Sequence, residues 1–223
     1  MKTNVVWRLI LKDWRLQRHV MILSIAAGVI ALAILRVGGQ TPTVIGATFF
    51  FISMMFCASI LPITNIVNER KKQLPFLMSL PVSSARYGAA KLLSTLGMFL
   101  VPWLTLVAAA LYMILGRHVL SNGAIPTMLI LANLPLIGFC LITGTALVAG
   151  SEFWGNAAVA GVNSSYWLVW YLLASQVPSP PHTWASPVAV WKPAANILVA
   201  QFGLIVLILG LTLYLQSRSR NFL

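Results

Sequence analysis

Six long apolar runs constrain the fold of this chain more than any other feature. They lie at residues 20–36, 43–67, 92–115, 126–149, 156–175 and 197–216. Each comes close to the roughly 20 residues that a helix needs to cross the hydrocarbon core of a bilayer. Strands do not fit, because the alternation of a membrane barrel is missing and a lipid-exposed backbone must satisfy its own hydrogen bonds. We therefore predict an all-α integral membrane protein with six transmembrane helices, in a single domain over residues 1–223.

Composition supports the same class. Hydrophobic residues make up 59% of the chain and charged residues 8%, against about a quarter charged in soluble domains. The net charge of +12 comes from cations in loops beside apolar runs, where they are expected to face lipid headgroups or partner proteins. Nucleic-acid binding is disfavoured, because no basic helix or aromatic-rich sheet pattern accompanies the charge.

The distribution of Lys and Arg predicts the orientation of the chain. If the N-terminus is cytoplasmic, that side receives twelve of these cations and the opposite side receives three, Arg36, Arg117 and Lys192. Cytoplasmic loops of membrane proteins carry such an excess. We therefore predict that both termini are cytoplasmic.

Residues 1–19 have an amphipathic pattern. Apolar and basic residues fall on opposite faces of a helix there, which predicts a helix lying in the membrane interface. Its candidate anchors are Trp7, Arg8, Lys12, Trp14 and Arg15. A signal peptide and a plain basic flank that sets topology are the alternatives.

The apolar runs lack the groups that intramembrane chemistry needs. No Asp, Glu, Lys, Arg or His sits in the middle of any run, which disfavours an ion-coupled carrier and an intramembrane hydrolase. His19, His118 and His182 are scattered, and Cys57 and Cys140 have no neighbouring metal ligands. The chain also has no phosphate-binding P-loop. We therefore assign no catalytic and no metal-ligating residues.

Uncharged polar residues do occur in the runs. Such residues commonly bond across helix interfaces in lipid, and they can also line a polar pathway. The cluster Asn163, Ser164 and Ser165 is dense enough to suggest a pathway. The candidate lining residues are Asn133, Thr143, Asn163, Ser164 and Ser165.

The loop at residues 68–91 is unlike a simple connector. It places apolar residues between basic flanks, in a segment too short to cross a membrane. Pro75 and Pro81 bracket a short helix, and Ser83 or Ser84 can cap the next one. These residues predict an apolar helix that docks into a groove of a soluble partner.

This loop resembles that between the second and third membrane helices of ABC-2 type transporter permeases. The resemblance is carried by Glu69-Arg70, Leu80-Pro81-Val82-Ser83, Tyr87 and Lys91, and by Lys12-Asp13 in the N-terminal helix. It implies that residues 72–79 form the coupling helix that inserts into an ATPase subunit. It also implies that Glu69 pairs with Arg70, Lys72 or Arg86. The implied coupling residues are Glu69, Arg70, Lys72, Leu74, Phe76, Leu77, Met78, Pro81 and Arg86.

The resemblance further implies partners and location. Two copies of a P-loop ATPase subunit would bind ATP and Mg, and a second permease copy or a related permease would complete the membrane part. The implied function is export of a hydrophobic or amphipathic substrate across a bacterial inner membrane. In similar transporters the loop corresponding to residues 176–196 dips back into the membrane, whereas its five prolines by themselves predict a stiff connector. The alternative from the residues alone is a membrane anchor or sensor that recruits a soluble partner through residues 68–91.

Overall fold

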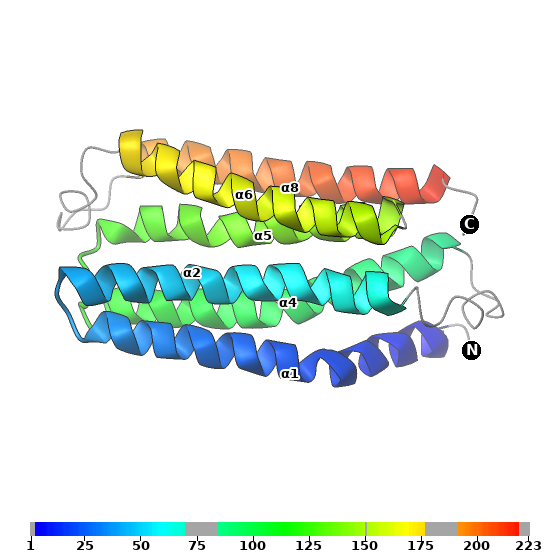
Figure 1. Cartoon of the computed structure of the whole chain (residues 1–223), viewed down its shortest axis with the longest axis horizontal. Helices are drawn as coiled ribbons and strands as arrows, with labels where there is room; N and C mark the ends of the chain where they lie inside the picture. The colour runs from blue at the N-terminus through cyan, green and yellow to red at the C-terminus, as the bar shows by residue number, and fades with distance from the viewer. Residues whose placement is uncertain (1–2, 70–83, 150, 177–190, 219–223) are drawn as a thin grey trace.

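The computed structural model describes residues 3–69, 84–149, 151–176 and 191–218. In these residues the chain forms helices and no strand. The elements are α1 (Thr3–Arg36), α2 (Gln40–Pro62), the π-helical segment η1 (Ile63–Val67), α4 (Ser84–Leu115), α5 (Ala124–Ala149), α6 (Glu152–Gln176) and α8 (Lys192–Arg218). Figure 1 shows the long helices lying side by side in one bundle.

Five helices of the described residues are long and apolar enough to cross a membrane. They cover Ile10–Arg36, Thr41–Val67, Tyr87–Leu115, Ala124–Ala149 and Ala194–Arg218. The predicted fifth span, in α6, is not among them. Asn156, Asn163, Ser164 and Ser165 lower the hydropathy of this helix. The fold is thus that of a multi-pass helical membrane protein.

The ends of the bundle differ in what they carry. Figure 1 shows that α1 begins and α8 ends at the same end, which we call the terminal end. The α1–α2 and α4–α5 connections lie at the other end, which we call the far end. Residues 70–83, between the end of α2–η1 and the start of α4, lie outside the described residues.

Helix boundaries agree with the predicted runs except at the start of the chain. The predicted interfacial segment is continuous with the first span, because α1 is one helix over Thr3–Arg36, and the interfacial position of its first turns stays a prediction. No proline or glycine interrupts residues 3–27, so the backbone hydrogen bonds continue from the basic segment into the apolar run. The predicted cap at Ser83 or Ser84 fits the start of α4 at Ser84.

Helix α5 forms the centre of the bundle. It packs against α2, α4, α6 and α8, and most of its length is buried. Phe99 of α4 stacks on Phe139 of α5 with ring centroids 4.4 Å apart, in a core cluster that also contains Cys57 and Cys140. The two cysteines are therefore buried packing residues, as their apolar surroundings in the sequence predicted.

Two glycines allow close helix contacts. A Cβ at Gly46 of α2 would lie 2.9 Å from the Ala31 carbonyl oxygen of α1. A Cβ at Gly144 of α5 would lie 2.5 Å from the Thr212 hydroxyl oxygen of α8. Small residues at such positions let membrane helices approach closely, and they fix α1 on α2 and α8 on α5.

Candidate functional site

Six polar residues meet inside the terminal end of the bundle, and we call them the ionic cluster. They come from three helices: Lys12 and Asp13 from α1, Asn65 and Glu69 from η1 and the helical residues that follow it, and Lys91 and Thr95 from α4. Asn65 and Glu69 are four residues apart, as are Lys91 and Thr95, so each pair lies on one helix face. The cluster thus joins three helices at one point.

Lys91 is the centre of this cluster, and its side chain is only 2% exposed. Its Nζ donates to Asp13 Oδ2 at 2.8 Å and to Asn65 Oδ1 at 3.3 Å. It also donates to Glu69 Oε2. An ammonium group has three donors, so Lys91 is fully satisfied by three side chains from two neighbouring helices.

Asn65 and Thr95 orient the acceptors around Lys91. Asn65 Nδ2 donates to Thr95 Oγ1 at 2.7 Å, which leaves its amide oxygen facing the lysine. The Thr95 hydroxyl donates in turn to the Lys91 carbonyl oxygen at 2.7 Å. Asp13 is 1% exposed, and its Oδ1 has no hydrogen-bond partner among the described residues.

Lys12 forms the outer edge of the cluster. Its Nζ lies 2.5 Å from Glu69 Oε1, and its side chain is 36% exposed, against 9% for Glu69. Two lysines therefore face two carboxylates, and the cluster is electrically balanced. Since the whole chain has only three acidic residues, this site uses two of them. Burial of charge is costly unless it is paired and hydrogen-bonded, and here the pairs are in place.

Helix lengths place the cluster relative to a bilayer. From Asp13 to the end of α1, and from Lys91 to the end of α4, each helix runs about 35 Å at 1.5 Å per residue. A hydrocarbon core is about 30 Å thick. If the far ends of these helices sit at one membrane surface, the cluster lies just beyond the core at the other surface. A buried charge network is least costly there, where headgroups and water begin.

The sequence predicted Glu69 as a junction residue but paired it with other cations. The partners that the structure gives Glu69 are Lys12 and Lys91, which are 57 and 22 residues away. Arg70, Lys72 and the rest of the predicted coupling helix, with Leu74, Phe76, Leu77, Met78 and Pro81, lie outside the described residues, as does the Arg86 side chain. Asp13, Asn65, Lys91 and Thr95 were not predicted as site residues.

The candidate pathway residues fall into two groups. Asn133 and Thr143 of α5 are buried inside the bundle, at 3% and 0% exposure. Asn133 Nδ2 donates to Gln201 Oε1 of α8 at 3.4 Å, and Gln201 Nε2 donates to the Ile130 carbonyl oxygen. Asn133 therefore acts as a bond between α5 and α8. Ser164 and Ser165 of α6 are exposed on the outside of the bundle, and Asn163 is half-buried.

The candidate anchors of α1 also separate. Trp7, Arg8 and Arg15 are exposed, as an interfacial anchor requires. Trp14 packs instead against the core cluster of the bundle, and Lys12 binds Glu69. Two of the five candidate anchors, Lys12 and Trp14, therefore contact the bundle.

The fold and the ionic cluster together define a class of membrane protein. The chain is a multi-pass helical membrane protein with a buried charge network at the base of the connection between α2–η1 and α4. Residues 8–150 match the family described as ABC-2 family transporter protein, and the chain belongs to this family. Comparison with curated proteins and with solved structures gave no match. The protein is thus an ABC transporter permease, a membrane component of transport.

Proposed function

We propose that this chain is the membrane subunit of an ATP-driven exporter, and that a separate P-loop ATPase subunit drives it through residues 68–91. The observation that carries the proposal is the ionic cluster, whose members lie on both sides of residues 70–83. Glu69 immediately precedes this segment, and Lys91 follows it in the first turns of α4. In a permease of this family the cluster would hold both ends of the coupling segment.

The cluster also gives the coupling segment a rigid base. Because Lys91 binds Asp13 and Glu69 together, force on the segment would reach α1, α2–η1 and α4 at once. Membrane helices transmit such displacements as rigid units when their contacts are well packed. ATP and Mg would be bound by the ATPase subunit, since this chain has no P-loop.

The proposed orientation of the protein in the membrane rests on the positive charge of the terminal end. We propose that this end, with Arg8, Lys12, Arg15 and Arg18 of α1 and Arg218 of α8, faces the cytoplasm of a bacterium, in the inner membrane. Helix α6 would be the sixth span. It packs along α5 (Figure 1), and its end residues match the predicted run within a few positions.

The outer face of α6 is the proposed meeting place of two permease copies. Ser164, Ser165 and Asn156 are exposed there, together with Ala160 and Gly161. Polar residues of membrane helices normally face protein or a water-filled cavity rather than lipid. A second copy, or a related permease, would cover this face, and a hydrophobic or amphipathic substrate would pass along it.

A capture experiment tests the coupling proposal. The tagged protein would be purified from native membranes in mild detergent, beside a variant carrying Phe76→Asp and Leu77→Asp, and each would be assayed for a P-loop ATPase. Retention by the parent and loss by the variant is the expected result. Val37→Asp is the matched control, because Val37 is 75% exposed and lies at the far end, where no ATPase contact is proposed.

The opposite result has a clear meaning. If intact parent protein captures no ATPase, the exporter function is wrong and an anchor or sensor remains. If the double variant captures as much ATPase as the parent, residues 76 and 77 are not the docking point. Replacement of Ser164 and Ser165 by Ala should reduce export by reconstituted vesicles while leaving ATPase capture unchanged, and unchanged export would remove α6 from the pathway.

A further inference from the structure

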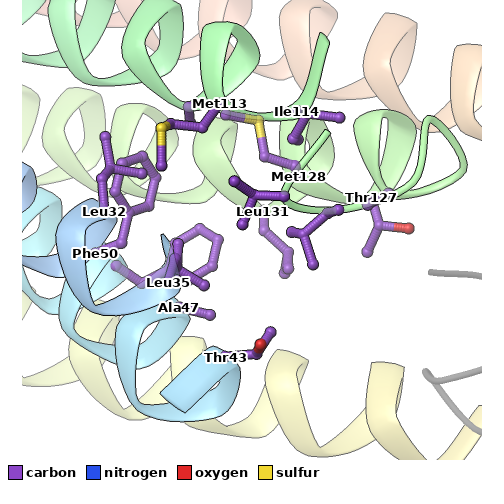
Figure 2. Close-up of a pocket in the computed structure, with 15 residues that line it drawn as sticks. Leu32, Leu35, Thr43, Ala47, Phe50, Met113, Ile114, Thr127, Met128 and Leu131 are labelled. Atoms are coloured by element: carbon purple, nitrogen blue, oxygen red, sulfur yellow. The ribbon is translucent and has the colours of Figure 1, made fainter. Parts of the chain in front are cut away.

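An apolar pocket opens at the far end of the bundle, away from the ionic cluster. It lies between α1, α2, α4 and α5, and the connection between α4 and α5 closes one side (Figure 2). Figure 2 shows Leu32 and Leu35 of α1 facing Met113 of α4 and Met128 and Leu131 of α5 across this space. None of the side chains that line it is charged. The pocket is separate from the candidate pathway on α6.

The chemistry of the wall favours an apolar occupant. Its hydroxyl groups come from Thr43 and Thr127, and the Thr43 hydroxyl is already used, since it donates to the Gly39 carbonyl oxygen at 2.7 Å. Water needs two to four polar partners to occupy a cavity, and apolar cavities stay dry. An empty pocket would also lose dispersion contacts along its wall. An alkyl group would restore these contacts without hydrogen bonds.

Size and depth suit the end of one acyl chain. The cavity volume is about 70 Å³, which is room for roughly five groups of the size of a water molecule. The wall reaches from Thr43 to Phe51 along α2. Phe51 lies about 16 Å from the start of α2 at 1.5 Å per residue, which is about half of a 30 Å hydrocarbon core. The pocket therefore covers the depth of a single leaflet.

Two exposed arginines are close in the sequence to residues of the pocket wall. Arg36 follows the wall residue Leu35, and Arg117 lies two residues before the wall residue Val119. Lys and Arg are sparse at this end, where the described residues hold Arg36, Arg117 and Lys192. Guanidinium groups bind phosphate bidentately. Cations that follow or precede the wall of an apolar pocket match the two parts of an anionic phospholipid.

We propose that this pocket binds one phospholipid with an anionic headgroup. One acyl chain passes between Leu35, Met113 and Met128 with its end toward Phe51, and Arg36 and Arg117 bind the phosphate. The lipid comes from the leaflet at the far end of the bundle. It would fix α1 and α2 against α4 and α5 at this end, as the ionic cluster fixes α1, α2 and α4 at the other. The proposal does not depend on ATPase coupling.

Photo-labelling by lipids tests the proposal. The full chain would be reconstituted with phosphatidylglycerol or phosphatidylcholine that carries a diazirine at the end of one acyl chain, and labelled peptides would be mapped by mass spectrometry. We expect phosphatidylglycerol to label residues 113–131 several-fold more than phosphatidylcholine does. Equal labelling by both lipids, or no labelling of these residues, would overturn the proposal.

Variants separate the two parts of the site. Ala47→Phe fills the pocket and should reduce labelling by either lipid several-fold, whereas Ala26→Phe, at an exposed position of α1 outside the pocket, should not. Arg36→Gln with Arg117→Gln should remove the preference for phosphatidylglycerol. This pair changes exposed side chains only, so it remains informative if Ala47→Phe impairs folding. A preference that survives the loss of both arginines would contradict headgroup binding.

Discussion

Lys91 of α4 and Asp13 of α1 are 78 residues apart in the sequence, and their side chains meet at 2.8 Å inside the bundle. Both are almost completely buried. Breaking a buried ion pair leaves an uncompensated charge, which typically costs about 3 to 5 kcal/mol. Mutation of either residue of the pair should therefore lower the stability of the fold strongly. Mutation of neighbouring residues that are less buried should lower it less.

Lys91→Met should destabilise the protein strongly. The change leaves Asp13 and Glu69 facing each other without their shared cation, and we expect a loss of about 3 kcal/mol or more in the free energy of unfolding. The measurement is thermal or denaturant unfolding in detergent. Lys12→Met is the control: Lys12 is 36% exposed and bound at the edge, so its loss should cost about 1 kcal/mol or less. Equal losses of unfolding free energy for the two variants would show that burial of the lysine does not determine the loss.

A double-mutant cycle should show that Asp13 and Lys91 act as a pair. If Asp13→Asn is made together with Lys91→Met, the combined loss of stability should be smaller than the sum of the single losses, by about 1 to 3 kcal/mol. The reason is that the first change already removes the contact. Additive losses would mean that each residue contributes through other contacts.

Gly144→Ala should destabilise the contact between α5 and α8. The added methyl group would meet the Thr212 hydroxyl oxygen at 2.5 Å, and overpacking of this kind costs about 1 to 3 kcal/mol. Thr212→Ala in the same chain should restore stability, because it removes that oxygen. Gly161→Ala is the matched control, since a Cβ at Gly161 would meet nothing within 4 Å. Failure of Thr212→Ala to restore stability would mean that contacts other than the Thr212 hydroxyl limit the room at Gly144.

Gln201→Leu should weaken the α5–α8 contact only modestly. It removes the bonds from Gln201 to Asn133 and to the Ile130 carbonyl oxygen, and bonds between membrane helices contribute on average about 0.6 kcal/mol and up to about 1.7. Unfolding in detergent would measure this loss. A larger loss than that of Lys91→Met would show that the Asn133–Gln201 pair, rather than the ionic cluster, dominates polar stabilisation.

Most of the architecture could be predicted from the sequence, because apolar length is a direct signal of membrane helices. The start of α4 at Ser84 could also be predicted, because a serine after Pro81 is a good helix cap. The continuity of α1 could not be predicted, because the composition changes near His19 and Val20 while the helix continues. Composition reports the surroundings of a helix, and it does not report where the helix ends.

The pairing within the ionic cluster could not be predicted from the sequence. Glu69 was predicted to pair with nearby cations, because sequence proximity is the only distance that a single chain offers. Lys91 and Lys12-Asp13 were noticed as parts of a family resemblance, with no means of seeing that they meet. The scarcity of acidic residues was the available signal. In a chain with three of them, each one inside or beside an apolar run needs a cation, and the choice between fifteen cations requires the fold.

The order in which the cluster can assemble follows from where its members lie. Asp13 and Glu69 belong to the first two long helices, and Lys91 belongs to the third. During synthesis, the two carboxylates therefore emerge before the cation that they share, and the first two helices enter the membrane with this charge only partly compensated. Once α4 has been synthesised, Lys91 can pair with both carboxylates. Helices α1, α2–η1 and α4 should thus pack stably together only after α4 has been synthesised. Helices α5, α6 and α8 would then pack against these three helices.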